Sequence, residues 1–89
     1  MTNRSLHQDV RKILLTDWDP IGVRDVPQAQ DEYDDYVPRI AEMVTNRRSI
    51  VEVSEYLLHL ETSVMGLPGD RERARSVAGK LAEIAQPGA

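Results

Sequence analysis

Residues 49–66 read SIVEVSEYLLHLETSVMG and carry the clearest helical signal of this chain. Apolar side chains recur there every three or four positions, as on one face of an α-helix. They are Ile50, Val53, Leu57, Leu60 and Val64. Ser49 and Glu52 have the spacing of a capping box, in which each side chain accepts a hydrogen bond from the other residue's backbone N–H. Gly66 suits the left-handed residue that closes a helix. We therefore predict a central helix over 50–65.

Three further helical segments flank this one, at about 6–16, 31–46 and 71–86, each with its own apolar stripe. The stripes consist of Leu6, Val10, Ile13 and Leu14; of Tyr33, Tyr36, Val37, Ile40, Ala41 and Val44; and of Ala74, Val77, Ala78, Leu81 and Ile84. Phe is absent and aromatic residues make up only 4% of the chain, which favours helices packed on helices over a β-sandwich. We predict an all-α fold, a compact bundle of four helices. Residues 1–89 form a single domain, with an ordered core of about 6–85 and a short tail at 86–89.

Pro38 is the unusual residue of the second segment. Inside a helix, proline removes one hydrogen bond and clashes with the carbonyl four residues back. The helix therefore either begins near Val37, or begins near Asp31 and bends at Pro38. We favour the bent helix, because the apolar stripe continues unbroken through the proline.

The remaining helix ends have their own signals. Ser5 and Gln8 have the spacing of a capping box for the first helix. Asp70 is suited to cap the fourth helix, and Pro87-Gly88 to end it. Gly79 lies inside the fourth helix, where it costs up to ~1 kcal/mol relative to alanine. We interpret this glycine as a sign that a neighbouring helix approaches closely.

The stripes predict which side chains form the core. The expected core is Leu14, Ile40, Val44, Val53, Leu57, Leu60, Val77 and Leu81. Trp18 follows Leu14 by four residues, so its indole is expected to fold over the end of the first helix. Val51, Leu58 and Met65 widen the apolar surface of the third helix beyond one face, and a homodimer would bury this surplus.

Composition excludes several classes of function. The chain has 89 residues, a net charge of −4 and no cysteine, so it has no disulfide framework and no thiolate metal site. An acidic chain is poorly suited to bind nucleic acid, which requires a basic face. No segment has the length and apolar character of a signal peptide or a membrane span. We expect a cytoplasmic protein with no nucleic-acid or membrane partner.

Residues 17–36 form an acidic region unlike the helices around it. The region holds seven acids and one arginine, a local charge of −6, together with Trp18, Tyr33 and Tyr36. Six of these acids are candidate partner-binding residues: Asp17, Asp19, Asp31, Glu32, Asp34 and Asp35. Alternatively, the acids at the helix start are only solvated, where the helix dipole favours them. The two tyrosines suit either the core or an interface, and a buried Tyr hydroxyl could bond to Asp17 or Asp19.

No residue pattern points to catalysis. His59 and Glu55 are four residues apart, a spacing that could supply two metal ligands. At the same spacing from His7 stands Arg11, a cation, which is unfavourable beside a metal ligand. Such histidines are usually solvated surface residues. Ser5 and Ser49 are explained by capping, and no histidine forms a nucleophilic constellation with them. We therefore expect a non-enzyme with no catalytic residue, no metal site and no cofactor.

Two strings in the acidic region carry a resemblance to a known family. W-D-P-I-G-V at 18–23 and D-E-Y-D-x-Y at 31–36, followed by a helix that ends in Met-Gly-Leu at 65–67, resemble a family of small bacterial helical proteins of uncharacterised function. The resemblance covers roughly residues 6–85. It implies a stand-alone, all-helical cytoplasmic protein with no assigned catalytic residues. In size and charge alone, without a shared motif, the chain is also similar to immunity proteins that accompany secreted bacterial toxins.

Three functional hypotheses follow. The leading one is a protein-binding module, in its more specific form an immunity-like inhibitor, that presents its acidic region (17–36) to a basic protein partner. Acidic surfaces speed association with basic partners. The second is a structural or homo-oligomeric helical protein without such a partner. The third is a metal- or small-ligand-dependent enzyme.

Overall fold

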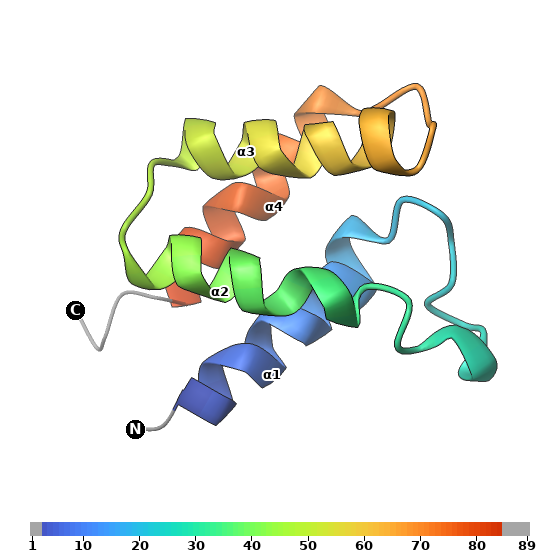
Figure 1. The fold of residues 1–89 in the computed structure, drawn as a ribbon, viewed down its shortest axis with the longest axis horizontal. Coiled ribbons are helices and arrows are strands. Elements are labelled where there is room, and N and C mark those ends of the chain that lie inside the picture. The colour runs from blue at the N-terminus through green and yellow to red at the C-terminus, as the bar shows by residue number, and fades with distance from the viewer. Residues whose placement is uncertain (1–2, 85–89) are drawn as a thin grey trace.

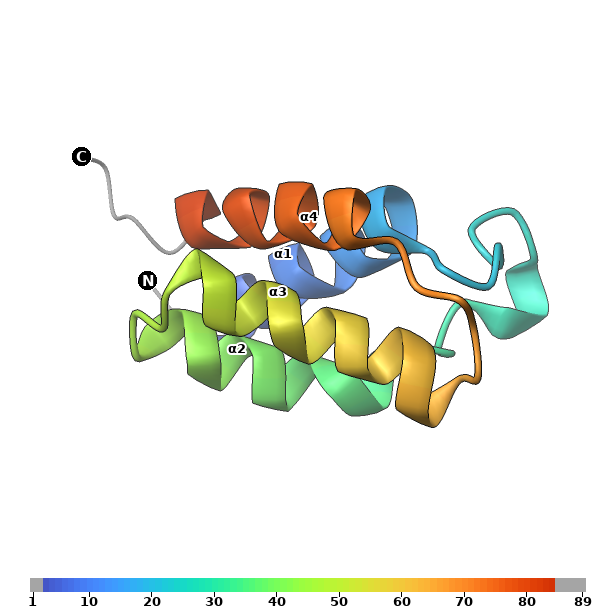
Figure 2. The ribbon, with the colours of Figure 1, turned by 90° about the horizontal axis from the view of Figure 1, so that it is seen from above.

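The computed structural model describes the backbone of residues 3–84 and the side chains of residues 6–84. The four α-helices are α1 (Asn3–Ile13), α2 (Val37–Thr45), α3 (Ile50–His59) and α4 (Arg71–Ile84). The structure is 72% helical, and its described residues contain no strand, which confirms the predicted all-α fold of four helices. α2 and α3 form an antiparallel hairpin, and α1 and α4 run obliquely across it (Figures 1 and 2).

Two of the helices continue into a wider, π-helical turn. Leu14–Trp18 (η1) follows α1, and Leu60–Val64 (η4) follows α3. Each turn ends on a backbone hydrogen bond that spans five residues. Asp19 N donates to Leu14 O at 2.8 Å, and Met65 N donates to Leu60 O at 2.9 Å. Such π turns are rare and mostly occur as single turns within α-helices.

The second helix is bent by 27°, as expected. A 3₁₀ turn, Asp34–Tyr36 (η3), precedes the α-helical part, which begins at Val37. Pro38 therefore occupies the first turn of α2. Its missing N–H and fixed φ are tolerated there, because the first N–H groups of a helix have no intrahelical partner.

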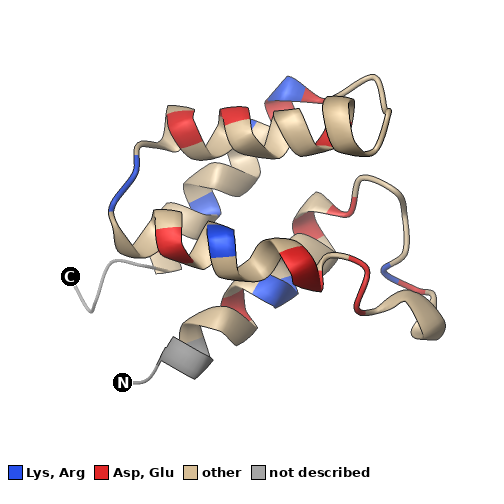
Figure 3. Cartoon of the chain, in the orientation of Figure 1, with Lys and Arg blue, Asp and Glu red and all other residues tan. Residues whose placement is uncertain are grey.

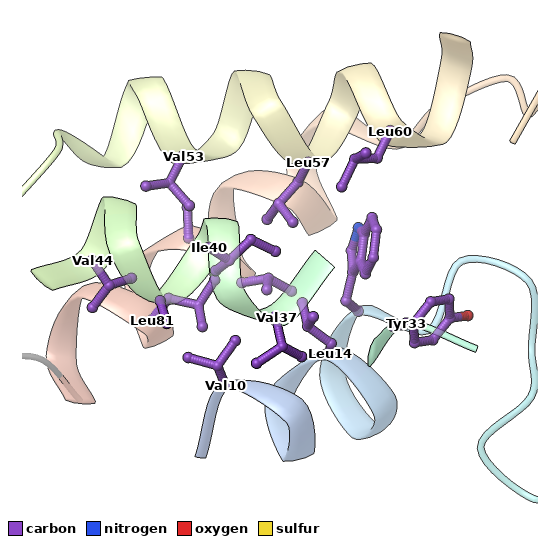
Figure 4. Packing of buried hydrophobic residues seen from close by; sticks show 14 of the residues in the cluster. Val10, Leu14, Tyr33, Val37, Ile40, Val44, Val53, Leu57, Leu60 and Leu81 are labelled. Carbon is purple, nitrogen blue, oxygen red and sulfur yellow. The ribbon is translucent and has the colours of Figure 1, made fainter. Parts of the chain in front are cut away.

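The core lies between the α2–α3 hairpin and the crossing pair α1 and α4 (Figure 4). All of the residues predicted for the core are buried: Leu14, Ile40, Val44, Val53, Leu57, Leu60, Val77 and Leu81. Trp18 and Tyr33 are also buried, each with an exposed fraction of 1%, whereas Tyr36 is half-buried against the cluster. Trp18 thus packs against the core at the end of the first helix, as its spacing from Leu14 predicted.

The predicted stripe of α3 is wrong at both ends. Ile50, the first residue of α3, is 43% exposed. Val64 is 55% exposed, because each residue of the π turn η4 advances less around the axis than in an α-helix. Glu61 takes the buried place, with no exposed surface. Val51 is 55% exposed, so apolar surface does remain on the outside of α3.

Several predicted helix ends are confirmed. Ser49 and Glu52 form both hydrogen bonds of the capping box. Asp70 caps α4, since its Oδ1 accepts a hydrogen bond from Arg73 N at 3.0 Å. Gly66 is left-handed, with φ of 72°.

Two predictions about helix residues are wrong, and a third concerns residues outside those that the structure describes. The first helix already includes Asn3, so Ser5 lies within α1 and does not begin it. No neighbouring atom lies within 4 Å of a Cβ placed on Gly79, so close helix packing does not explain that glycine. The expected stop at Pro87-Gly88 and the tail at 86–89 lie outside the described residues.

Candidate functional site

The segment between η1 and α2 is the part of the molecule with the least regular structure, and we call residues 19–33 the connector. It projects from one end of the bundle, opposite the beginning of α1 and the end of α4 (Figure 1). It holds only one short 3₁₀ turn, Pro27–Ala29 (η2). Backbone hydrogen bonds within turns hold part of it, and side chains that bond to its backbone hold the rest.

The connector begins at a buried polar contact. Trp18 Nε1 donates to Oε2 of the fully buried Glu61 at 2.7 Å. Oε1 of Glu61 accepts from Asp70 N at 2.9 Å and lies 3.5 Å from Nη2 of Arg73. A buried carboxylate is costly unless it is paired and hydrogen-bonded, and here both oxygens have partners. Glu61 thereby joins the end of η1 to the loop that leads into α4.

Tyrosine rings enclose the indole of Trp18. The centroid of Tyr33 lies 5.3 Å away with the two rings tilted, and that of Tyr36 lies 6.4 Å away edge-on. Both arrangements are favourable for aromatic pairs. Trp18 therefore connects the bundle core to the two tyrosines of the acidic region.

Asp19 organises the first half of the connector. Its backbone is left-handed, with φ of 34°, so the chain reverses direction after η1. One carboxylate oxygen, Oδ1, accepts from Val23 N at 2.8 Å and from the hydroxyl of Tyr33 at 2.9 Å. The other, Oδ2, accepts from Arg24 N at 3.1 Å. The Tyr33 hydroxyl in turn accepts from Ile21 N at 3.2 Å.

The Tyr33 hydroxyl is held in its neutral, donating form. Burial raises the pKa of Tyr33 above its usual range, because the phenolate would lose its hydration. The hydrogen bond to Asp19 raises this pKa further, and the N–H of Ile21 opposes the change. Of the two partners that the sequence suggested for Tyr33, the structure therefore selects Asp19.

Gln30 holds the second half of the connector. Its side-chain Nε2 lies within hydrogen-bonding distance of three carbonyl oxygens, at 3.1 Å from Val23, 2.9 Å from Arg24 and 3.0 Å from Val26. The backbone oxygen of Gln30 accepts from Arg11 Nη2 at 3.1 Å. The connector is consequently closed on itself and attached to α1.

The candidate partner-binding acids fall into two groups. Asp19 is used within the connector, Asp17 Oδ1 lies 3.5 Å from Nζ of Lys80, and Asp34 accepts from Arg11 Nε at 2.7 Å. Asp31 and Glu32 are exposed on the surface. Asp35, next to Asp34, is exposed as well. Three of the acids thus contact other residues of the chain, although Asp17 is still exposed, and three are exposed without such a contact among residues 6–84. Acidic positions follow one another along the connector and the turn before α2 (Figure 3).

The histidines lie apart from this region. His7 and His59 are exposed on α1 and at the end of α3. Across residues 6–84, no three histidine, aspartate or glutamate side chains gather closely enough to hold a metal ion. Among helices with described placement, none has the length and apolar character needed to cross a bilayer.

Two residues essential to this geometry were missed from the sequence. Glu61 follows Leu57 by four positions, so a carboxylate on the apolar stripe was a visible signal of a buried acid. Gln30 had no such signal, because its role appears only when the connector closes around its amide.

Comparison of the chain with models of protein families, with curated proteins and with solved structures finds no match. The geometry of the connector is therefore the basis on which a function is proposed.

Proposed function

We propose that the chain is a cytoplasmic, non-enzymatic protein-binding module that presents the connector to a basic protein partner. The observation that carries this proposal is a fixed loop with apolar residues on its surface. Asp19, Tyr33 and Gln30 hold the backbone, yet Ile21 and Val26 are each 40% exposed. A preorganised loop loses little conformational entropy on binding, and functional residues are often carried by such loops.

The surface charge supports the choice of partner. Asp25, Asp31, Glu32 and Asp35 are exposed on or beside the connector. Apolar residues with a charged rim have the general composition of a protein interface. The acids would speed the encounter with a basic surface, and the apolar residues would slow dissociation. Asp17, Asp19 and Asp34 would contribute through the fold, since they are already engaged within it.

An immunity-like inhibitor is the more specific form of this proposal, with a basic toxin as its partner. Its support is the size and acidity of the chain together with the exposed surface of the connector. We also propose that the chain is a member of the small bacterial helical family that its 18–23 and 31–36 strings resemble.

The experiment is capture of partners from the native host, followed by binding kinetics. The test variant is Asp31→Asn, Glu32→Gln, Asp35→Asn. The matched control is Asp9→Asn, Glu72→Gln, Glu83→Gln, which removes the same charge from exposed positions on α1 and α4. We expect slower association and weaker salt dependence for the test variant alone. Equal association rates for the two variants would refute the proposal.

A homodimer is the second candidate, favoured by the exposed apolar residues at the start of α3. Ile50 and Val51 are neighbours there, and Leu58 and Met65 are half-buried further along. Light scattering over a range of concentrations tests this function. If the chain dimerises, its mass should be near twice 10.1 kDa, and Val51→Glu should lower that mass. A mass near 10.1 kDa at every concentration would exclude the homodimer.

A further inference from the structure

A cationic cavity lies between α1 and the connector, on a chain whose net charge is −4. Its volume is about 290 Å³. Arg11, Lys12 and Arg24 line it together with Gln8, Gln30 and Leu15, and none of its lining residues is acidic. This local excess of positive charge stands out within a region whose sequence is mostly acidic.

The two arginines are fixed in place by contacts that leave most of their donors free. Arg11 uses Nε for Asp34 and Nη2 for the carbonyl of Gln30. Arg24 donates from Nη1 to the carbonyl of Thr16 at 3.0 Å. A guanidinium has five N–H donors, so several remain on each side chain. Such preoriented arginines suit the planar, two-oxygen geometry of carboxylate and phosphate groups.

Lys12 and Leu15 complete the cavity. Lys12 is exposed, and its ammonium group has no ion pair or hydrogen bond with any side chain of residues 6–84. Leu15 is buried and provides an apolar wall. Asp34 pairs with Arg11, so Lys12 and Arg24 are the cavity's cations that form no ion pair among residues 6–84.

We propose that this cavity binds a small organic anion bearing a carboxylate or phosphate group. Arg11, Arg24 and Lys12 bind the anionic group, and Leu15 packs against the apolar part of the ligand. The amide of Gln8 is available to its polar atoms, whereas Nε2 of Gln30 already donates to backbone carbonyls of the connector. A volume of about 290 Å³ is at the small end of ligand sites, so the part of the ligand that it holds is small. This inference does not depend on the proposed protein-binding function.

The experiment is an NMR titration of the full chain with two probes, inorganic pyrophosphate and citrate, at constant ionic strength set with sodium chloride. We expect saturable shifts of the backbone amides of Lys12, Leu15, Thr16 and Arg24, with a dissociation constant below about 1 mM for at least one probe. Saturation by one probe alone assigns the site to phosphate or to carboxylate ligands. The absence of saturation with both probes overturns the proposal.

Lys12→Gln is the test variant, because it removes a cation without removing a contact that holds the fold. Arg75→Gln is its matched control, since Arg75 is exposed on α4 and does not line the cavity. We expect Lys12→Gln to weaken binding about tenfold, as the loss of a charged hydrogen bond does. Arg75→Gln should leave binding unchanged. Equal weakening by both variants would mean that the anion responds only to total charge, and would refute the site.

Arg24→Gln provides an independent check. It removes the contact with Thr16 as well as one cation, so its fold must be compared with the parent by its amide spectrum. With the fold preserved, binding should again weaken about tenfold. Unchanged affinity in a folded Arg24→Gln variant would also overturn the proposal.

Discussion

Trp18 and Glu61 lie 43 residues apart in sequence, and the indole Nε1 of Trp18 donates to the buried carboxylate of Glu61 at 2.7 Å. Each residue belongs to a π turn, Trp18 to η1 and Glu61 to η4. The contact therefore joins the two places where the helices depart from regular α geometry. It also fixes the residue that immediately precedes the connector. The shape of the candidate interface consequently depends on a contact inside the bundle.

Breaking this contact should destabilise the fold. Trp18→Phe keeps an aromatic ring but leaves Oε2 of Glu61 without its donor, so we expect a loss of about 2–4 kcal/mol in the free energy of unfolding. Glu61→Gln should cost about 1–3 kcal/mol, because its amide cannot accept from both Trp18 and Asp70. Urea unfolding of both single variants and the double variant measures the coupling. Fully additive losses would show that the two side chains do not act together.

The π turn in α3 can be tested with two apolar residues of the same predicted stripe. Leu57→Ala should cost about 2–5 kcal/mol, since Leu57 is completely buried. Val64→Ala should change stability by less than about 0.5 kcal/mol, because Val64 is mostly exposed. Thermal and urea unfolding provide the comparison. Similar losses for both variants would mean that α3 continues as a regular helix through Val64.

Local signals were sufficient for much of the bundle. Ser49, Glu52 and Gly66 act within a few residues of their own helix, so their roles could be predicted from spacing. The apolar period likewise identified buried residues such as Leu57 and Leu81, because a regular helix converts spacing directly into a face. The bend at Pro38 was predicted from the continuous stripe, but the α-helix itself begins at Val37 and not near Asp31, because the residues before it form a 3₁₀ turn.

Several of the failures depend on contacts and turns that form only when the chain has folded. Val64 faces solvent because η4 is π-helical, and no feature of its own neighbourhood in the sequence indicates that turn. The fixed conformation of the connector depends on Gln30 and Tyr33 meeting backbone groups several residues away. Acid content alone could not separate Asp34, which pairs with Arg11, from Asp35, which is exposed.

Replacement of glycine by alanine should have opposite effects on stability at Gly79 and Gly69. Gly79→Ala should stabilise the chain by about 0.5–1 kcal/mol, because Gly79 lies within α4 and no atom approaches its Cβ position. Gly69→Ala should destabilise it by about 1–3 kcal/mol. Gly69 has φ of 89°, and a Cβ there would lie 2.8 Å from Cγ2 of Thr62. Melting temperatures that move in the same direction for both variants would contradict this account.

Tyr33 should make the fold sensitive to alkali. Its pKa is raised in the folded state by burial, while in the unfolded chain the pKa is close to the ordinary tyrosine value of about 10. Above about pH 10 the unfolded chain therefore loses a proton that the folded chain retains, and stability falls as pH rises. The stabilising effect of the neutral hydroxyl is fully present below that pH. Tyr56 has a pKa raised by burial as well and adds to the same decline.

Tyr33→Phe separates the contribution of Tyr33 from that of Tyr56. At neutral pH the variant should be less stable by about 1–2 kcal/mol, because Asp19 loses a donor and Ile21 N loses its acceptor. Above about pH 10 the variant should lose stability less steeply than the parent, by up to about 1.4 kcal/mol per pH unit. Urea unfolding of both proteins from about pH 8 to pH 11 measures the two slopes. Tyr33→Phe keeps Tyr56 and every other titrating group, so parallel curves would show that the hydroxyl of Tyr33 ionises as readily in the folded protein as in the unfolded chain.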